Sequence, residues 1–94
     1  MDRTSGRIAK RIQVTGRVQG VFFRKAARRE AEMLGLSGWA HNEADGSVTI
    51  VVEGDPDSIK EFVDWSRTGP PDAQVERVEV FDIAYSGLDR FHIR

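Results

Sequence analysis

The sequence of 94 residues has the length of one compact domain and leaves no room for a second hydrophobic core. Fourteen lysines and arginines against fifteen acidic residues give a net charge of −1, which argues against a protein that holds nucleic acid mainly by electrostatic attraction. Because the chain has no cysteine, disulfides, thiolate metal sites and cysteine nucleophiles are excluded, and two histidines alone make a poor zinc site.

No part of the sequence points to a membrane or to secretion. The apolar runs are far shorter than the roughly 20 residues that span a bilayer, and the polar opening lacks the apolar core of a signal peptide. We therefore expect a soluble, cytoplasmic protein. We also expect residues 1–7 to form a flexible tail and residues 8–94 to form a single domain.

The first half of the domain predicts a strand, a loop and a helix. Residues 8–14 alternate between apolar and polar side chains, as in a half-buried strand. Over residues 23–34 the apolar side chains recur at helical spacing, and Gly35 follows as a natural helix stop. The segment 16–22 is left as the loop that joins the strand to the helix.

A β-hairpin is predicted next. Residues 39–42 and 47–53 have the pattern of two strands, and residues 43–46 join them in a short turn in which Gly46 can take a positive φ.

The last third predicts a helix and two strands. Asp55 and Pro56 are typical of an N-cap and a first helical turn, and residues 69–71 end the helix that follows. Residues 75–83 predict a fourth strand and residues 91–93 a short fifth one.

The predicted order is β-α-β-β-α-β with a short C-terminal strand. This order is typical of an α+β fold, the ferredoxin-like split βαβ sandwich, in which two helices cover one face of an antiparallel-dominated sheet. Many unrelated functions use that scaffold, so the fold alone decides no function.

The stretch GRVQGVFFR, residues 16–24, carries the first candidate site. Gly16 and Gly20 allow a tight turn, and at a helix start several main-chain N–H groups have no partner and can converge on an anion. Arg24 and Lys25 stand in the first helical turn, where the helix dipole disfavours cations. A bound phosphate would explain them, and Arg24 could hold two of its oxygens in a planar fork.

A plainer interpretation stays open for this stretch. Glycine-containing turns between strand and helix are common, and an arginine beside one is usually a solvated surface charge. The sequence lacks both the P-loop and the dinucleotide-binding signatures.

Asn42 is the second candidate, at the end of a strand just before a turn. Its amide can donate to an oxygen and accept a proton of water, although an asparagine in this place is more often a turn residue. His41 is expected to point to the opposite face. Trp39 and the pair Phe22 and Phe23 are expected in the core or as loop anchors.

Four blocks, GRVQGVFFR, LGLSGWAHN, DGSV and GPPDAQVERVEV, resemble in order and spacing the small acylphosphatases. The resemblance runs from about residue 8 to the C-terminus. It implies an enzyme that hydrolyses the carboxyl-phosphate bond of small acyl phosphates without a metal or other cofactor, by direct attack of a positioned water. The net charge and the short apolar runs give no reason to expect a nucleic-acid or membrane partner, and we expect a monomer because the periodicity shows no long unprotected apolar patch. We also expect the product, inorganic phosphate, to inhibit competitively.

The resemblance assigns roles to particular residues. Arg24 closes the first block, at the position that binds the phosphate in the family, and Asn42 closes the second, at the position that orients the attacking water. The implied phosphate-binding residues are Gly16, Arg17, Val18, Gln19, Gly20, Val21, Phe22 and Arg24.

Three places depart from the family pattern. His41 stands where arginine or lysine is frequent, which weakens an auxiliary cation at neutral pH. Glu43 stands where a small polar residue is frequent, and a carboxylate pointing inward there would raise KM. The last residues, 91–94, lack the tyrosine that many members carry.

Two other kinds of protein compete with a hydrolase. A non-catalytic phosphate-binding module is one, and an accessory domain of the kind attached to carbamoyl-transfer proteins is the other. An RNA-recognition motif is not favoured, because its aromatic strand block is missing.

Overall fold

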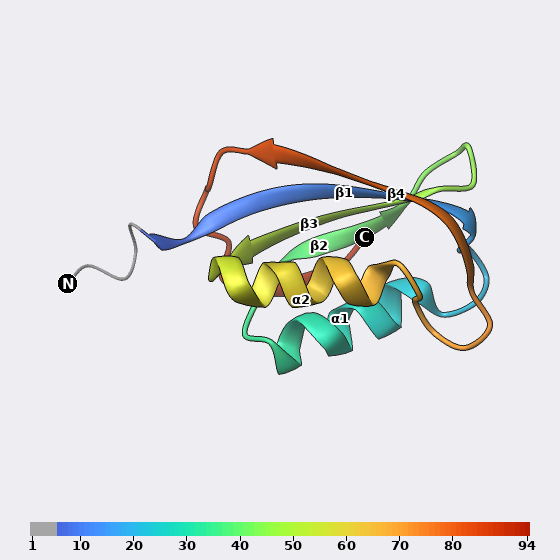
Figure 1. Cartoon of the computed structure of the whole chain (residues 1–94), viewed down its shortest axis with the longest axis horizontal. Coiled ribbons are helices and arrows are strands. Elements are labelled where there is room, and N and C mark those ends of the chain that lie inside the picture. The colour runs from blue at the N-terminus through green and yellow to red at the C-terminus, as the bar shows by residue number, and fades with distance from the viewer. Residues whose placement is uncertain (1–5) are drawn as a thin grey trace.

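A computed structural model describes residues 6–94 of the chain. Most of the predicted flexible tail, residues 1–5, lies outside the described residues. The elements follow in the predicted order (Figure 1): β1 (Ile8–Arg17), α1 (Phe23–Met33), β2 (Ser37–Asn42), β3 (Val48–Gly54), α2 (Pro56–Ser66), β4 (Gln74–Ile83) and β5 (Phe91–Ile93). Within residues 6–94, no helix is both long enough and apolar enough to cross a bilayer.

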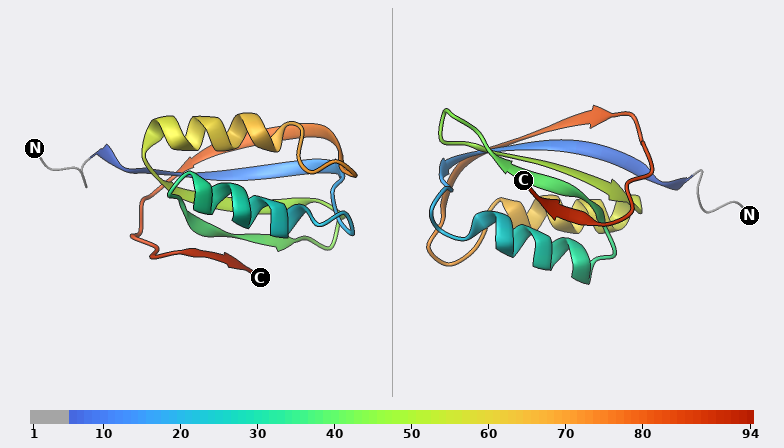
Figure 2. Two further views of the ribbon diagram at one scale, coloured as in Figure 1. Left: turned by 90° about the horizontal axis from the view of Figure 1, so that it is seen from below. Right: turned by 180° about the vertical axis from the view of Figure 1, so that it is seen from behind.

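The five strands form one sheet in the order β4-β1-β3-β2-β5. Three of the four pairings, β4 with β1, β1 with β3 and β3 with β2, are antiparallel, and only β5 runs parallel to its neighbour β2. Both helices cover the same face of this sheet, as Figure 2 makes clear from two further sides. The predicted ferredoxin-like sandwich is confirmed.

The core lies between the sheet and the two helices. Alternate residues of the central strands β1 and β3 point toward the helices and are fully buried: Ile12, Val14, Val48, Ile50 and Val52. Phe23 of α1 and Phe62 of α2 meet them from the other side, and burial of each phenylalanine contributes about 1.5–3 kcal/mol. This packing fixes the start of α1 against the sheet.

The helix starts differ in a way that bears on function. Asp55 caps α2, since its carboxylate accepts a hydrogen bond of 3.1 Å from the main-chain N–H of Asp57. By contrast α1 has no side-chain cap and no acidic residue in its first turn. The positive end of its dipole is therefore left without a counter-charge from its own helix.

The first strand is longer than the sequence predicts. Gly16 and Arg17 do not belong to the loop but pair with Val75 and Gln74 of β4, after a register shift that follows Thr15. A Cβ atom at Gly16, whose φ is +130°, would collide with the main-chain oxygen of Gln74. Glycine is thus needed here for a close approach of two strands.

Two aromatic side chains lie away from the places expected for them. Trp39 sits half-buried on the sheet face that the helices leave open, with the guanidinium of Arg94 4.4 Å from the centre of its ring. Phe22 is 75% exposed, whereas its neighbour Phe23 is buried as expected. The alternation of side chains along β2 explains Trp39, because Ala40 takes the core-facing position beside it.

A crossing segment, residues 84–90, carries the chain from β4 at one edge of the sheet to β5 at the other (Figure 2). It is held by Glu53, whose carboxylate accepts hydrogen bonds from the main-chain N–H groups of Ser86 and Leu88, both 2.7 Å, and from the Ser86 hydroxyl, 2.9 Å. Because Glu53 is only 2% exposed, it anchors this segment firmly.

Candidate functional site

The loop between β1 and α1, residues 18–22, is held by side chains buried in the core and by hydrogen bonds to the turn between β2 and β3. Val18 and Val21 are buried in the core. The side-chain amide of Gln19 donates hydrogen bonds to the main-chain oxygens of Glu43, 2.7 Å, and Ser47, 2.9 Å. The loop is therefore tied to both ends of the turn between β2 and β3.

Left-handed backbone at two positions shapes this loop. Gly20 has φ +74° and Phe22 has φ +64°, the latter the only positive φ of a non-glycine residue in the part of the chain that the structure describes. A bulky residue in this region costs roughly 1–2 kcal/mol. Strain of this kind is common at functional sites.

Main-chain N–H groups of the loop and helix start are available to a ligand. The first of them to donate within the helix is that of Ala26, to the oxygen of Phe22 at 3.0 Å. Among residues 6–94, no acceptor takes a hydrogen bond from the N–H groups of Gln19 to Arg24. Together with the uncapped dipole of α1, they offer a positive potential and several donors to an anion.

Arg24 lies in the first turn of α1 and is half-buried. Its Nη1 donates a hydrogen bond of 2.6 Å to the main-chain oxygen of Arg94. The N–H of Arg94 in turn donates to the oxygen of Ala40 on β2, 2.8 Å. The end of the chain thus positions this guanidinium, a contact that the sequence does not reveal.

Asn42 ends β2 and shares the helix-facing side of that strand with Ala40. A chain of hydrogen bonds fixes the hairpin that follows: the amide of Gln13 donates to the hydroxyl of Ser47, 2.6 Å, and that hydroxyl donates to the carboxylate of Asp45, 2.6 Å. The hydrogen bonds that Asp45 accepts from the hydroxyl and from the main-chain N–H of Ser47 lower the pKa of its carboxyl group below the usual range. Asn42 is therefore held on a rigid hairpin.

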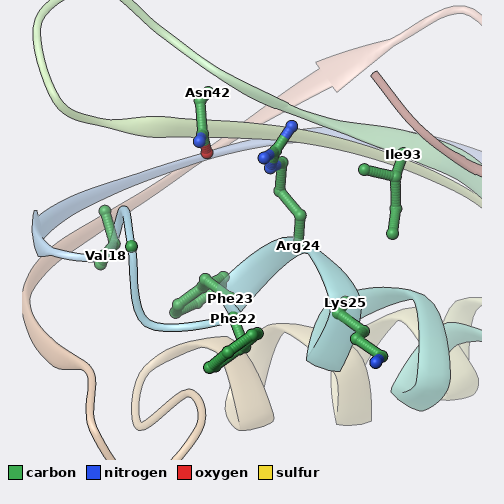
Figure 3. A pocket seen from close by; sticks show the side chains of 8 residues that line it. Val18, Phe22, Phe23, Arg24, Lys25, Asn42 and Ile93 are labelled. Carbon is green, nitrogen blue, oxygen red and sulfur yellow. The ribbon is translucent and has the colours of Figure 1, made fainter.

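Arg24 and Asn42 face each other across a pocket of about 300 Å³ (Figure 3). The pocket is lined by Val18, Gly20, Phe22, Phe23, Arg24, Lys25, Asn42 and Ile93. None of these side chains carries a carboxylate, an imidazole or a hydroxyl. The arrangement can bind a phosphate-sized anion and present a neutral amide to it, without a general base from a side chain.

The sequence-based candidates separate into three groups. Val18, Gly20, Phe22 and Arg24 line the pocket together with Asn42. Gln19 and Val21 belong to the same loop but turn their side chains to the hairpin and the core. Gly16 and Arg17 lie in β1 and do not line the pocket, because their main chain pairs with β4.

His41 and Glu43, the two hairpin residues that depart from the acylphosphatase pattern, do not line the pocket. His41 is exposed and lies on the opposite side of β2 from Asn42, as expected. Glu43 lines a separate groove with Arg11 and Trp39. An inward carboxylate at the phosphate position is therefore absent from the lining of the pocket.

Sequence reasoning missed three lining residues: Phe23, Lys25 and Ile93. Phe23 is expected only in the core or as a loop anchor, and it is indeed buried. Ile93 reaches the pocket only because β5 pairs with β2 across the sheet, which local patterns do not encode. The unfavourable place of Lys25 as a cation in the first helical turn is the one local signal that could put it near the pocket.

The fold and the pocket define a small α+β sandwich with a candidate anion site where a strand-to-helix loop meets a hairpin. The acylphosphatase family model matches residues 10–93. An acylphosphatase of a Nocardioides species is 51% identical over 88 residues, which cover 94% of this chain and 89% of the relative. The chain belongs to the acylphosphatase family.

Solved structures agree with this assignment. An acylphosphatase from Coxiella burnetii is 36% identical and superposes with a TM-score of 0.95, covering all of this chain and 99% of the other. The chain also resembles part of HypF from T. kodakarensis, 39% identical with a TM-score of 0.79, but covers only 11% of that protein. The comparisons that cover most of both chains are therefore with acylphosphatases.

Proposed function

We propose that this chain is a metal-independent acylphosphatase, which hydrolyses small acyl phosphates to a carboxylate and inorganic phosphate. Membership of a family that acts on such substrates gives the reaction class. The observation that carries the assignment of the site is the pocket in which Arg24 and Asn42 face each other above the free N–H groups of the loop.

The phosphoryl group of the substrate lies in the loop, residues 18–22. Its oxygens accept hydrogen bonds from the main-chain N–H groups there, and Arg24 binds it through the guanidinium and offsets the negative charge. Inorganic phosphate, the product, fits the same donors and acts as a competitive inhibitor. Gly16 and Arg17 support the loop through their pairing with β4.

Asn42 orients the attacking water through its side-chain amide. The water oxygen forms a bond to phosphorus, the bond from phosphorus to the acyl oxygen breaks, and its electron pair leaves with the carboxylate. An oxygen of the substrate's own phosphate takes the proton of the water. Since a carboxylate is a good leaving group, holding the reactants in place and neutralising charge suffice for the chemistry.

We propose that the enzyme is a monomer, since no long unprotected apolar stretch appears in its sequence. A chain without cysteines also fits a reducing, cytoplasmic compartment.

Hydrolysis of benzoyl phosphate in oxygen-18 water tests where the water attacks. Attack at phosphorus places the label in inorganic phosphate and none in benzoate, as mass spectrometry of both products would record. Label in benzoate would mean attack at the carbonyl carbon and would overturn the proposed role of the pocket. The buffer without protein serves as the control for spontaneous hydrolysis.

A further inference from the structure

Phe22 combines an unfavourable backbone conformation with a side chain that does not pack in the core. It is left-handed, at φ +64° and ψ +28°, and its ring is 75% exposed. The next residue, Phe23, does the packing, with its ring centre 5.4 Å from that of Trp65. An exposed aromatic ring on strained backbone at the rim of a pocket points to a contact with a ligand.

A second hollow, of about 400 Å³, lies on the other side of Phe22. It is lined by Phe22, Lys25, Ala26, Arg28, Arg29 and Glu32. Phe22 and Lys25 line both hollows, so the two adjoin at these residues. Three cations against one acidic residue make the second hollow basic.

The geometry of the reaction decides which way the substrate extends. In displacement at phosphorus, the attacking and leaving oxygens lie roughly in line on opposite sides of the phosphoryl group. Figure 3 shows Asn42 at one end of the first pocket and Phe22 and Lys25 at the other, with Arg24 between them. If the water lies at Asn42, the leaving acyl group lies toward Phe22 and Lys25.

We infer that Phe22 and Lys25 form the subsite for the acyl half of the substrate, and that Lys25 favours acyl groups that carry a second negative charge. The ring of Phe22 supplies an apolar surface for the carbon chain. The ammonium group of Lys25 meets a carboxylate or phosphate at the far end of that chain. This inference rests on the proposed function and names a substrate class for it.

Three substrates separate the two contributions. Acetyl phosphate has almost no acyl chain, butyryl phosphate adds an apolar chain, and succinyl phosphate has a chain of the same carbon number that ends in a carboxylate. In the wild-type protein we expect kcat/KM to be higher for succinyl than for butyryl phosphate. This preference should decline as the salt concentration rises, because Lys25 is exposed to solvent and salt screens its attraction to the carboxylate of the substrate.

Lys25→Met keeps the aliphatic stem and removes the charge. We expect it to lower the ratio of kcat/KM for succinyl over butyryl phosphate by about two- to fivefold, the range for an exposed ion pair. Lys60→Met, an exposed lysine on α2, is the matched control and should leave the ratio unchanged.

Phe22→Ala tests the apolar surface. We expect the preference for butyryl over acetyl phosphate to fall about two- to fivefold, because an apolar contact at a half-open surface is weaker than one in a closed pocket. Met33→Ala removes an equally exposed apolar side chain at the other end of α1 and should leave this preference unchanged.

The outcomes distinguish this inference from the proposed function. Failure of the folded wild-type protein to hydrolyse acetyl phosphate would overturn both. A different result would overturn the acyl subsite alone. In that case the wild-type protein hydrolyses acetyl phosphate, Lys25→Met leaves the ratio of succinyl over butyryl phosphate unchanged, and Phe22→Ala leaves the ratio of butyryl over acetyl phosphate unchanged.

Discussion

Arg24 is the side chain on which the proposed chemistry depends most. Arg24→Ala removes the guanidinium from the pocket, and we expect kcat/KM for benzoyl phosphate to fall by on the order of 10²–10³. Arg24→Lys keeps the charge but loses the planar fork, so its loss should be intermediate. Near wild-type kcat/KM in a folded Arg24→Ala protein, with folding checked by circular dichroism, would contradict the role.

Asn42 is expected to affect turnover rather than phosphate binding. Because it orients the water, Asn42→Ala should lower kcat by about 10²-fold. The inhibition constant of inorganic phosphate should change by less than about threefold, since the N–H donors and Arg24 remain. A steady-state titration with phosphate measures both quantities, and a large rise in the inhibition constant with kcat preserved would rule out this role.

At the residue scale, the motif blocks were enough to name Arg24 and Asn42 as candidates, and the structure brings these two side chains together. The same blocks did not predict the hydrogen bond between Arg24 and the main-chain oxygen of Arg94, because it joins residues 70 positions apart. A local pattern also gave no reason to expect Phe22 on left-handed backbone with its ring in solvent.

At the scale of elements, the sequence predicted every helix and strand, and most of the boundaries. The alternation of apolar and polar residues, the helical spacing and the Asp55–Pro56 helix start are local signals, so the elements that they predict are found in the structure. The end of β1 was wrong because Gly16 was interpreted as a loop glycine, whereas its register shift against β4 depends on a strand about 60 positions further on.

The crossing segment 84–90 gives an element-scale prediction. Glu53→Gln replaces its charged anchor, and we expect the free energy of unfolding at pH 7 to fall by roughly 1–3 kcal/mol. Glu61→Gln, at an exposed position on α2, is the matched control and should have little effect. Urea unfolding measures both variants.

The same carboxylate predicts a pH dependence. Burial raises the pKa of Glu53, but the hydrogen bonds from Leu88 and Ser86 together lower it further, so the net pKa lies below the usual range. Its contribution to stability is therefore present above the ordinary pKa of glutamate, about 4.3, and is lost as the pH falls through the folded-state value. The deficit of Glu53→Gln should shrink toward pH 3, and an equal deficit at pH 7 and pH 3 would contradict this account.

For the whole molecule, the sheet brings three distant parts of the chain to one place. The loop after β1, the end of β2 and the short β5 surround the pocket because β5 closes the sheet beside β2. The fold class followed from element order, but the contribution of β5 to the pocket did not, since a parallel pairing of three residues leaves little trace in a sequence. Fold and family together support a hydrolase of the acylphosphatase family.

The proposed function requires that this pocket hydrolyse acyl phosphates without a metal. The most direct test is the rate of benzoyl phosphate hydrolysis, followed by ultraviolet absorbance, before and after dialysis of the wild-type protein against EDTA. We predict an unchanged rate that inorganic phosphate inhibits competitively. No turnover by the folded protein, or a rate that EDTA abolishes and a divalent metal restores, would contradict the account.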